Sequence, residues 1–259
     1  MLNPMPAFKK PTISSGNYLL EFAEPMRKIR FEQARAEEAF ASIANTQSQQ
    51  TNVPDAADPQ LPRIIFQANR KSISVSQLKC QLDFSFENND LDIATQIKVL
   101  EKNSREFHSS AVKSFSVADY KLNALILDIQ FSSTSETIDL QRFIYDRFFK
   151  SPSIHPIASV QCSLGFKVED FFVNVSAQVY ESRSIGIKMS DGGIPQFVAI
   201  HNHDMVLLDQ GVSFRLDFNN RPCSERNGYK LGDESTEIFD IFNKFMVTDF
   251  HTLTGLSII

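Results

Sequence analysis

Alternating apolar and polar side chains define the clearest elements of this sequence, which lie between residues 158 and 218. Apolar residues occupy every second position from Val160 to Val168. The same alternation returns from Phe171 to Val179 and from Val212 to Phe218. Successive side chains of a strand point to opposite faces, so each run predicts a strand with one apolar face. We therefore expect an antiparallel sheet with one face in solvent.

Similar reasoning assigns the rest of the chain. Further strands are expected at Asn17 to Phe22, within Ile64 to Phe86, at Val112 to Val117, at Leu122 to Phe131 and at Met205 to Leu208. Helical spacing predicts helices after Pro25, from Asn88–Asp90 to about Ser110, from Thr137 to Lys150, and from about Asp233 onward. Strands followed by helices, twice over, predict an α+β fold of largely antiparallel sheets with helices covering one face.

The domain organisation follows from a change in composition. Residues 45–62 are rich in Gln, Asn, Thr, Ala, Asp and Pro, which is typical of a linker. We expect residues 1–61 to form an N-terminal arm, an amphipathic helix and this linker. That helix either packs on its own domain or docks on a neighbouring subunit. Residues 62–259 would form the α+β body, with two similar sub-halves at 62–150 and 151–259 as one arrangement of it.

Composition and charge narrow the classes of function. The chain has 259 residues, 42% of them hydrophobic, and a formal charge of -5, which argues against nucleic acid as a partner. Its three cysteines, Cys80, Cys162 and Cys223, form no close pair and predict free thiols in a reducing compartment. No apolar run is long enough for a membrane helix, and the first residues lack the pattern of a signal peptide. A cytoplasmic protein without membrane association is expected.

Two stretches carry a family resemblance. They are Val206-Leu207-Leu208-Asp209 with Phe214 to Phe218, and Phe245-Met246-Val247-Thr248-Asp249-Phe250; the early strands from Arg63 to Phe86 are similar in placement. In these features the second half resembles an uncharacterised, sporadically distributed bacterial family of about 250 residues. The family has no assigned activity, so the resemblance implies a bacterial or phage setting and no site residues.

One cluster has the chemistry of a metal site. His201 and His203 are two residues apart, so on a strand both imidazoles point to one side, and Asp204 adds a carboxylate. Asn202 and Asp204 are also frequent in turns, and a solvated hairpin explains the same residues. Metal-dependent catalysis by His201, His203 and Asp204 is therefore an alternative, and not the main hypothesis.

Other motifs for catalysis are absent from the sequence. There is no Gly-x-Ser-x-Gly, no Walker-type loop and no Gly-x-Gly-x-x-Gly, so we expect no catalytic residue and no cofactor. Phe172 and Tyr180, on the polar face of one strand, could stack on bases, but they lack basic neighbours.

Apolar surface is the feature that most suggests a function. Phe172, the amphipathic helix, the last helix and the C-terminal tail together carry more apolar surface than one sheet face is expected to cover. The alternative is that all of this surface is the internal core of a helix-covered α+β domain. We therefore expect a non-enzymatic protein that binds protein, most simply as a homo-oligomer; a structural subunit of a larger phage or secretion assembly is an alternative. The residues expected at the interface are Phe8, Met26, Ile29, Phe40, Phe172, Phe242, Phe245, Phe250, Leu256, Ile258 and Ile259.

Overall fold

The computed structural model describes residues 5–44, 47–86, 91–115, 120–149, 155–185, 205–221 and 234–258. Contacts group the chain into two compact units. Unit 1 comprises Met1–Pro11, Gln130–Cys162 and Ala177–Ser213, and unit 2 comprises Thr12–Ile129, Ser163–Ser176 and Phe214–Ile259. Each unit contains residues from both sides of position 61. The expected boundary between arm and body therefore does not coincide with the boundary between the units.

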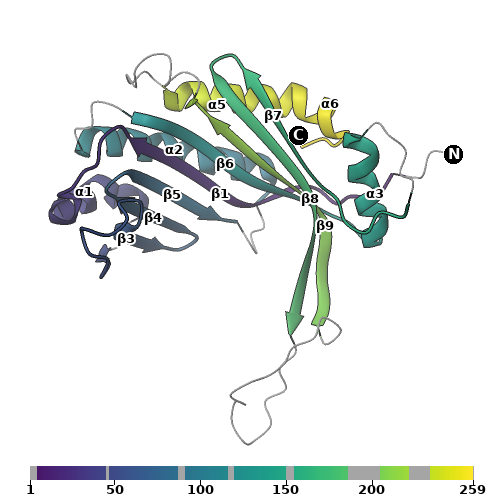
Figure 1. The fold of residues 1–259 in the computed structure, drawn as a ribbon, viewed down its shortest axis with the longest axis horizontal. Helices are drawn as coiled ribbons and strands as arrows, with labels where there is room; N and C mark the ends of the chain where they lie inside the picture. The colour runs from purple at the N-terminus through teal and green to yellow at the C-terminus, as the bar shows by residue number, and fades with distance from the viewer. Residues whose placement is uncertain are drawn as a thin grey trace, which may run out of the picture. The chain divides into compact units, whose positions relative to one another are not determined.

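Strands and helices alternate in groups along the described part of the chain. In order they are β1 (Thr12–Phe22), η1 (Ile29–Glu32), α1 (Gln33–Ala44), β2 (Gln49–Gln50), β3 (Pro62–Ala68), β4 (Lys71–Ser76), β5 (Lys79–Ser85), α2 (Ile93–Phe115), β6 (Tyr120–Ser132), α3 (Thr137–Phe148), β7 (Gln161–Val168), β8 (Phe171–Ile185), β9 (Met205–Asn219), α5 (Glu234–Lys244), η3 (Phe245–Asp249) and α6 (Phe250–Thr254). Figure 1 shows their course.

The order of elements repeats once. Apart from η1 and the two-residue β2, a strand, a helix, three strands and a helix form the first half as β1, α1, β3–β5 and α2, and the second half as β6, α3, β7–β9 and α5. The described strands form one sheet in the order β2-β3-β4-β5-β1-β6-β9-β8-β7. In each half the first strand therefore pairs with the last strand of the following three. The predicted α+β fold with antiparallel strands is confirmed.

Aromatic rings join the helices of unit 2 to one face of its strands. The ring of Tyr18 in β1 stacks on Phe239 of α5 with centroids 6.2 Å apart, and Phe40 of α1 stacks on Phe107 of α2 at 5.2 Å. Phe40 also meets Phe66 of β3 edge-on at 5.7 Å. These contacts place α1, α2 and α5 on the same face (Figure 1), and such pairs stabilise a core beyond the area they bury.

The opposite face of the unit 2 strands is polar. Ser15 of β1 donates a hydrogen bond to the Asp128 carboxylate of β6 at 2.8 Å, and Asn174 of β8 donates to Asp217 of β9 at 3.3 Å. Arg215 of β9, whose side chain is 59% exposed, pairs with the same Asp128 carboxylate. The expectation of a sheet with one face in solvent is confirmed for these strands.

The helix α2 corrects two predictions. Leu100, Phe107 and Ala111 form one buried stripe, and the helix continues along it to Phe115. The strand expected at Val112 to Val117 is therefore wrong for residues 112–115, which belong to α2. The start also differs, because the Asp92 carboxylate accepts a hydrogen bond from the Thr95 backbone at 2.9 Å and so caps the helix. Residues 88–90, which were expected to provide the cap, lie outside the described residues.

The first residues of the expected arm are part of unit 1. The Lys9 backbone donates to the Ser132 carbonyl at 2.8 Å, and Phe8 forms an isolated bridge with Ser133. The ring of Phe8 meets Phe143 of α3 edge-on, with centroids 5.2 Å apart. Phe8 is thus half-buried against its own chain.

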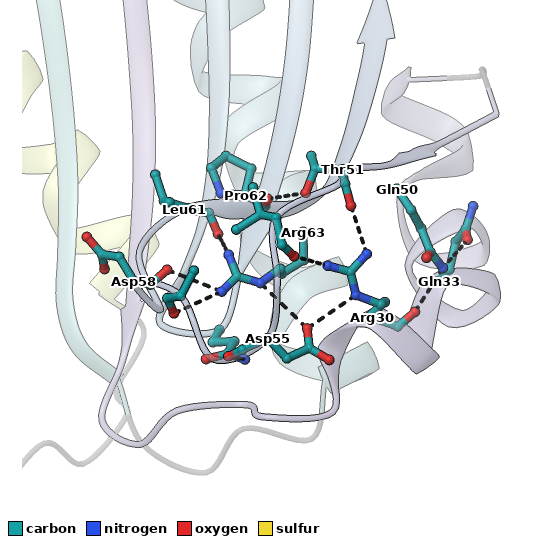
Figure 2. Close-up of polar contacts among 12 residues, drawn as sticks. Arg30, Gln33, Gln50, Thr51, Asp55, Asp58, Leu61, Pro62 and Arg63 are labelled. Atoms are coloured by element: carbon teal, nitrogen blue, oxygen red, sulfur yellow. Dashed lines mark hydrogen bonds and ion pairs between the residues drawn. The ribbon is translucent and has the colours of Figure 1, made fainter.

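A buried arginine organises the loop between β2 and β3 (Figure 2). The Arg63 side chain is 0% exposed and donates to the carbonyl of Leu61 at 2.6 Å and to those of Ala57 and Asp58 at 3.2 Å. Its Nε lies 3.7 Å from the Asp55 carboxylate. A guanidinium presents five N–H groups in a fixed fork, which suits several carbonyls on one loop.

A second arginine completes this arrangement. Arg30 donates to the Thr51 carbonyl at 2.8 Å and to that of Val53, and it pairs with the same Asp55 carboxylate at 3.2 Å. The described part of the predicted linker is therefore held by polar contacts. The α1 helix before it packs on α2, β3 and β4 in unit 2, as the first of the two interpretations of that helix expected.

Replacing Arg63 by methionine tests the importance of these contacts. Arg63→Met removes the donors from three loop carbonyls, and we expect the free energy of unfolding to fall by about 2–4 kcal/mol. Arg215→Met, which removes an exposed ion pair, should cost less than about 1 kcal/mol. Urea unfolding measures both, and equal stability of the two variants would contradict the role given to Arg63.

A glycine sets the spacing of β9 and β6 in unit 1. A Cβ at Gly211 would overlap the carbonyl oxygen of Phe131, which is backbone and cannot rotate away. We expect Gly211→Ala to lower the free energy of unfolding by about 2 kcal/mol or more. Gly165→Ala is the control, because its Cβ would approach only the Asn174 side-chain oxygen, at 3.0 Å. Urea midpoints that match for the two variants would show that β9 can move away from β6 at little cost.

Candidate protein-binding surface

Most of the predicted interface residues lie in the core of the single chain. Buried residues among them are Ile29, Phe40, Phe242, Phe245, Phe250, Leu256 and Ile258, with at most 6% exposure. Phe8, Met26 and Phe172 are half-buried, and Ile259 lies outside the described residues. The inference that these residues leave apolar surface uncovered is therefore wrong for the seven buried ones.

The reason is that the sheet of unit 2 covers them. Phe218 of β9 meets both Phe242 and Phe245 edge-on, with ring centroids 5.5 and 5.6 Å apart. Phe214 of the same strand meets Phe250 of α6 at 5.3 Å. The apolar face of β9 and the apolar surface of the last helices thus bury each other.

The metal candidates His201, His203 and Asp204 lie outside the described residues. Within the ranges that the structure describes, no group of three His, Cys, Asp or Glu side chains could hold a metal ion.

Exposed apolar side chains are concentrated instead at the start of β9. Val206, Leu207 and Leu208 are 61%, 41% and 64% exposed, although they follow one another in a strand. They belong to a two-stranded ribbon in unit 1, formed by the end of β8 and the beginning of β9, which continues past the end of β6 (Figure 1). Large apolar residues exposed in sequence are uncommon on soluble proteins and often mark a binding surface.

Hydrogen bonds show where the neighbouring strands end. β6 ends at Ser132, and the Ser133 backbone donates to the Gln210 carbonyl at 2.8 Å, so β6 accompanies β9 as far as that level. On the other side, the hydroxyls of Ser163 and Ser176 are 3.0 Å apart, which indicates that these residues of β7 and β8 lie opposite each other. In that register Gln161, the first residue of β7, lies opposite Gln178. Among the described strands, the ribbon beyond these points therefore has no neighbour at either edge.

A polar cluster fixes the base of the ribbon. The hydroxyl of Tyr180 in β8 donates to the Asp209 carboxylate of β9 at 2.7 Å, and the hydroxyl of Ser132 in β6 donates to the same oxygen at 2.8 Å. These three side chains come from three adjacent strands and share one face. Burial first, and then the Asp209 carboxylate, raise the pKa of the Tyr180 phenol well above its usual value.

The other face of the ribbon base is tied to the start of α3. The Thr137 hydroxyl donates to Glu181 at 2.8 Å and to Gln210 at 3.2 Å. Gln210 in turn donates to the Ser135 carbonyl at 2.6 Å. Arg183, and then Thr137, lower the pKa of the Glu181 carboxyl. The ribbon is therefore fixed on both faces where it leaves the unit.

The sequence contained a partial signal for this surface. Met205 to Leu208 was expected to be a strand, but four apolar residues in a row are also typical of a strand covered on both faces. Exposure here follows from the position at which β6 ends, which is a property of the tertiary structure.

Comparison with protein-family models, curated proteins and solved structures found no match. The resemblance of the second half to a sporadically distributed bacterial family stays a prediction. No helix in the described ranges has the length and apolar character needed to cross a membrane.

Substitution of Tyr180 tests the polar cluster. Tyr180→Phe leaves the Asp209 carboxylate without one of its donors, and we expect the free energy of unfolding at pH 7 to fall by about 1–2 kcal/mol. The phenol ionises near pH 10 in the unfolded chain and at higher pH in the folded one. Its contribution to stability is therefore complete below about pH 10 and is lost as the pH rises further.

Urea unfolding at pH 7 and at about pH 10.5 measures both effects. The wild type should lose more stability over this interval than Tyr180→Phe. Tyr145→Phe, on α3 of the same unit, is the control and should behave as the wild type does. A parallel loss of stability in the wild type and Tyr180→Phe would rule out a protonated Tyr180 as a stabilising donor.

Proposed function

We propose that this protein acts by binding protein, without catalysis, and that its principal contact is the edge of β9 from Met205 to Leu208. The observation that carries the proposal is the exposure of Val206, Leu207 and Leu208 in the part of β9 that lies beyond the end of β6. An open apolar edge offers backbone groups for pairing and side chains for burial on both faces. Soluble proteins usually protect such an edge with lysine or proline, and Met-Val-Leu-Leu contains neither.

A second copy of the chain is the simplest partner. Two β9 edges can pair antiparallel about a two-fold axis, and each strand then covers the same residues of the other. Pairing of this kind extends the sheet and buries Val206 and Leu208 on one face and Leu207 on the other. A contact of a few residues per strand is smaller than a standard interface of roughly 800 Å² per partner, so we expect a dissociation constant weaker than about 1 μM.

Charges on the other edge favour a closed dimer over a polymer. The ribbon segment of β8 carries Glu181 and Arg183, which pair with each other at 2.8 Å. Charged side chains on an edge strand disfavour further pairing. The alternative of a structural subunit in a larger assembly requires both edges to pair, and we therefore prefer the dimer.

We further propose a cytoplasmic setting. Among the described residues, Cys80 and Cys162 are buried free thiols. Burial raises the pKa of the Cys80 thiol well above its usual value, which keeps it protonated and unreactive. Thiols that remain unpaired are common in reducing compartments.

Sedimentation velocity over a concentration series tests the dimer. The wild type should pass from monomer to dimer between about 1 and 500 μM, and Val206→Lys/Leu208→Lys should remain monomeric throughout because a charged edge cannot pair. Val247→Lys is the matched control, since Val247 is 67% exposed in unit 2 and lies outside the ribbon. A wild type that stays monomeric across the series, or a double variant that dimerises as the wild type does, would refute pairing through β9.

A further inference from the structure

A small cavity lies between η1 and the end of α2 in unit 2. Its volume is about 260 Å³, and its apolar lining comes from Met26, Ile29 and Phe115. Ile29 is 1% exposed and so lies deep, whereas Met26 and Phe115 are half-buried. Phe115 also contacts the core, with its ring centroid 6.0 Å from that of Phe40.

Cations surround the mouth of this cavity. Arg27, Lys28 and Arg35 line it and are exposed. Arg35 lies 3.7 Å from the Glu32 carboxylate, which is in the same lining. Within the described part of the chain, no carboxylate forms an ion pair with Arg27 or Lys28. The mouth is therefore positive, although the chain as a whole carries a formal charge of -5.

A neighbouring arginine, Arg30, differs from Arg27 and Lys28 in its contacts. Arg30 belongs to the same short stretch, but its guanidinium turns to the loop between β2 and β3 and binds carbonyls there (Figure 2). Among the residues that the structure describes, Arg27 and Lys28 have no such side-chain partner. On the same turn Phe31 is 79% exposed, in a chain whose largest buried side chains are mostly phenylalanines.

We propose that this cavity binds an acidic segment of a partner protein, with one large apolar side chain inside it and the flanking carboxylates against Arg27 and Lys28. The volume lies below the roughly 300–1,000 Å³ of sites for whole small molecules, and it suits a single anchoring side chain. Arginine and lysine bind carboxylates through charge-assisted hydrogen bonds. This site is independent of the β9 edge.

Fluorescence anisotropy of the full chain tests the proposal. The probe is a labelled peptide with one phenylalanine between two pairs of glutamates. We expect saturable binding with a dissociation constant of roughly 10–100 μM, weakening at least fivefold between 50 and 300 mM salt. Replacing the phenylalanine of the peptide by alanine, or its glutamates by glutamines, should each weaken binding at least tenfold.

Two charge-reversal variants of the protein distinguish binding at this site from a general effect of net charge. Arg27→Glu/Lys28→Glu should weaken binding at least tenfold. Lys98→Glu/Lys102→Glu is the matched control, because both lysines are exposed on α2 and Lys102 lies 13 residues, or roughly 20 Å, from Phe115 along the helix. The control variant should bind as the wild type does, and circular dichroism confirms that both variants are folded.

Three results would overturn the proposal. The first is that no binding of the peptide is detected at concentrations up to about 1 mM. The second is an equal loss of affinity in the two double variants, and the third is unchanged affinity in Arg27→Glu/Lys28→Glu. Flotation with phosphatidylserine vesicles is run in parallel. Vesicle binding that depends on Arg27 and Lys28, without peptide binding, would assign these residues to a membrane surface instead.

Discussion

The close approach of β9 to β6 at Gly211 is the constraint on which the exposed ribbon depends. With no Cβ at this position, the backbone of β9 lies against the Phe131 carbonyl. Just beyond it, Asp209 receives hydroxyl donors from Tyr180 and Ser132. β6 ends at this level, so the contacts that hold β9 in place stop where its apolar residues become exposed. The ribbon is thus fixed at its base and uncovered at its edge.

The sequence predicted the strands well where polar and apolar residues alternate. β5, β7, β8 and the end of β9 have a strict period of two, which only a strand with one covered face produces. The end of α2 was misread because Val112 and Phe115 are also common in strands. Phe115, however, follows Phe107 and Ala111 at helical spacing and continues their stripe. At the end of α2, packing against the sheet therefore outweighs the preference of these residues for a strand.

The binding surface could not be predicted in the same way. Apolar residues were expected to exceed the available core, but Phe242 and Phe250 are completely buried against Phe218 and Phe214. Counting apolar residues does not reveal which element covers which. The loop before β3 shows the converse error. Its polar composition predicted a linker, whereas the buried Arg63 holds it through hydrogen bonds to backbone carbonyls. Every residue has such a carbonyl, so composition does not reveal these contacts.

The two proposed surfaces rely on different forces, which follows from their residues. The β9 edge offers backbone hydrogen bonds and uncharged side chains, so its pairing depends on apolar burial and responds weakly to salt. The cavity beside η1 offers Arg27 and Lys28 in solvent, where attraction falls off over a Debye length of about 8 Å at physiological salt. A cation at the mouth and an apolar floor select a partner by charge and by one side chain. A strand edge selects mainly by extended conformation, which is why a second copy of the same chain satisfies it.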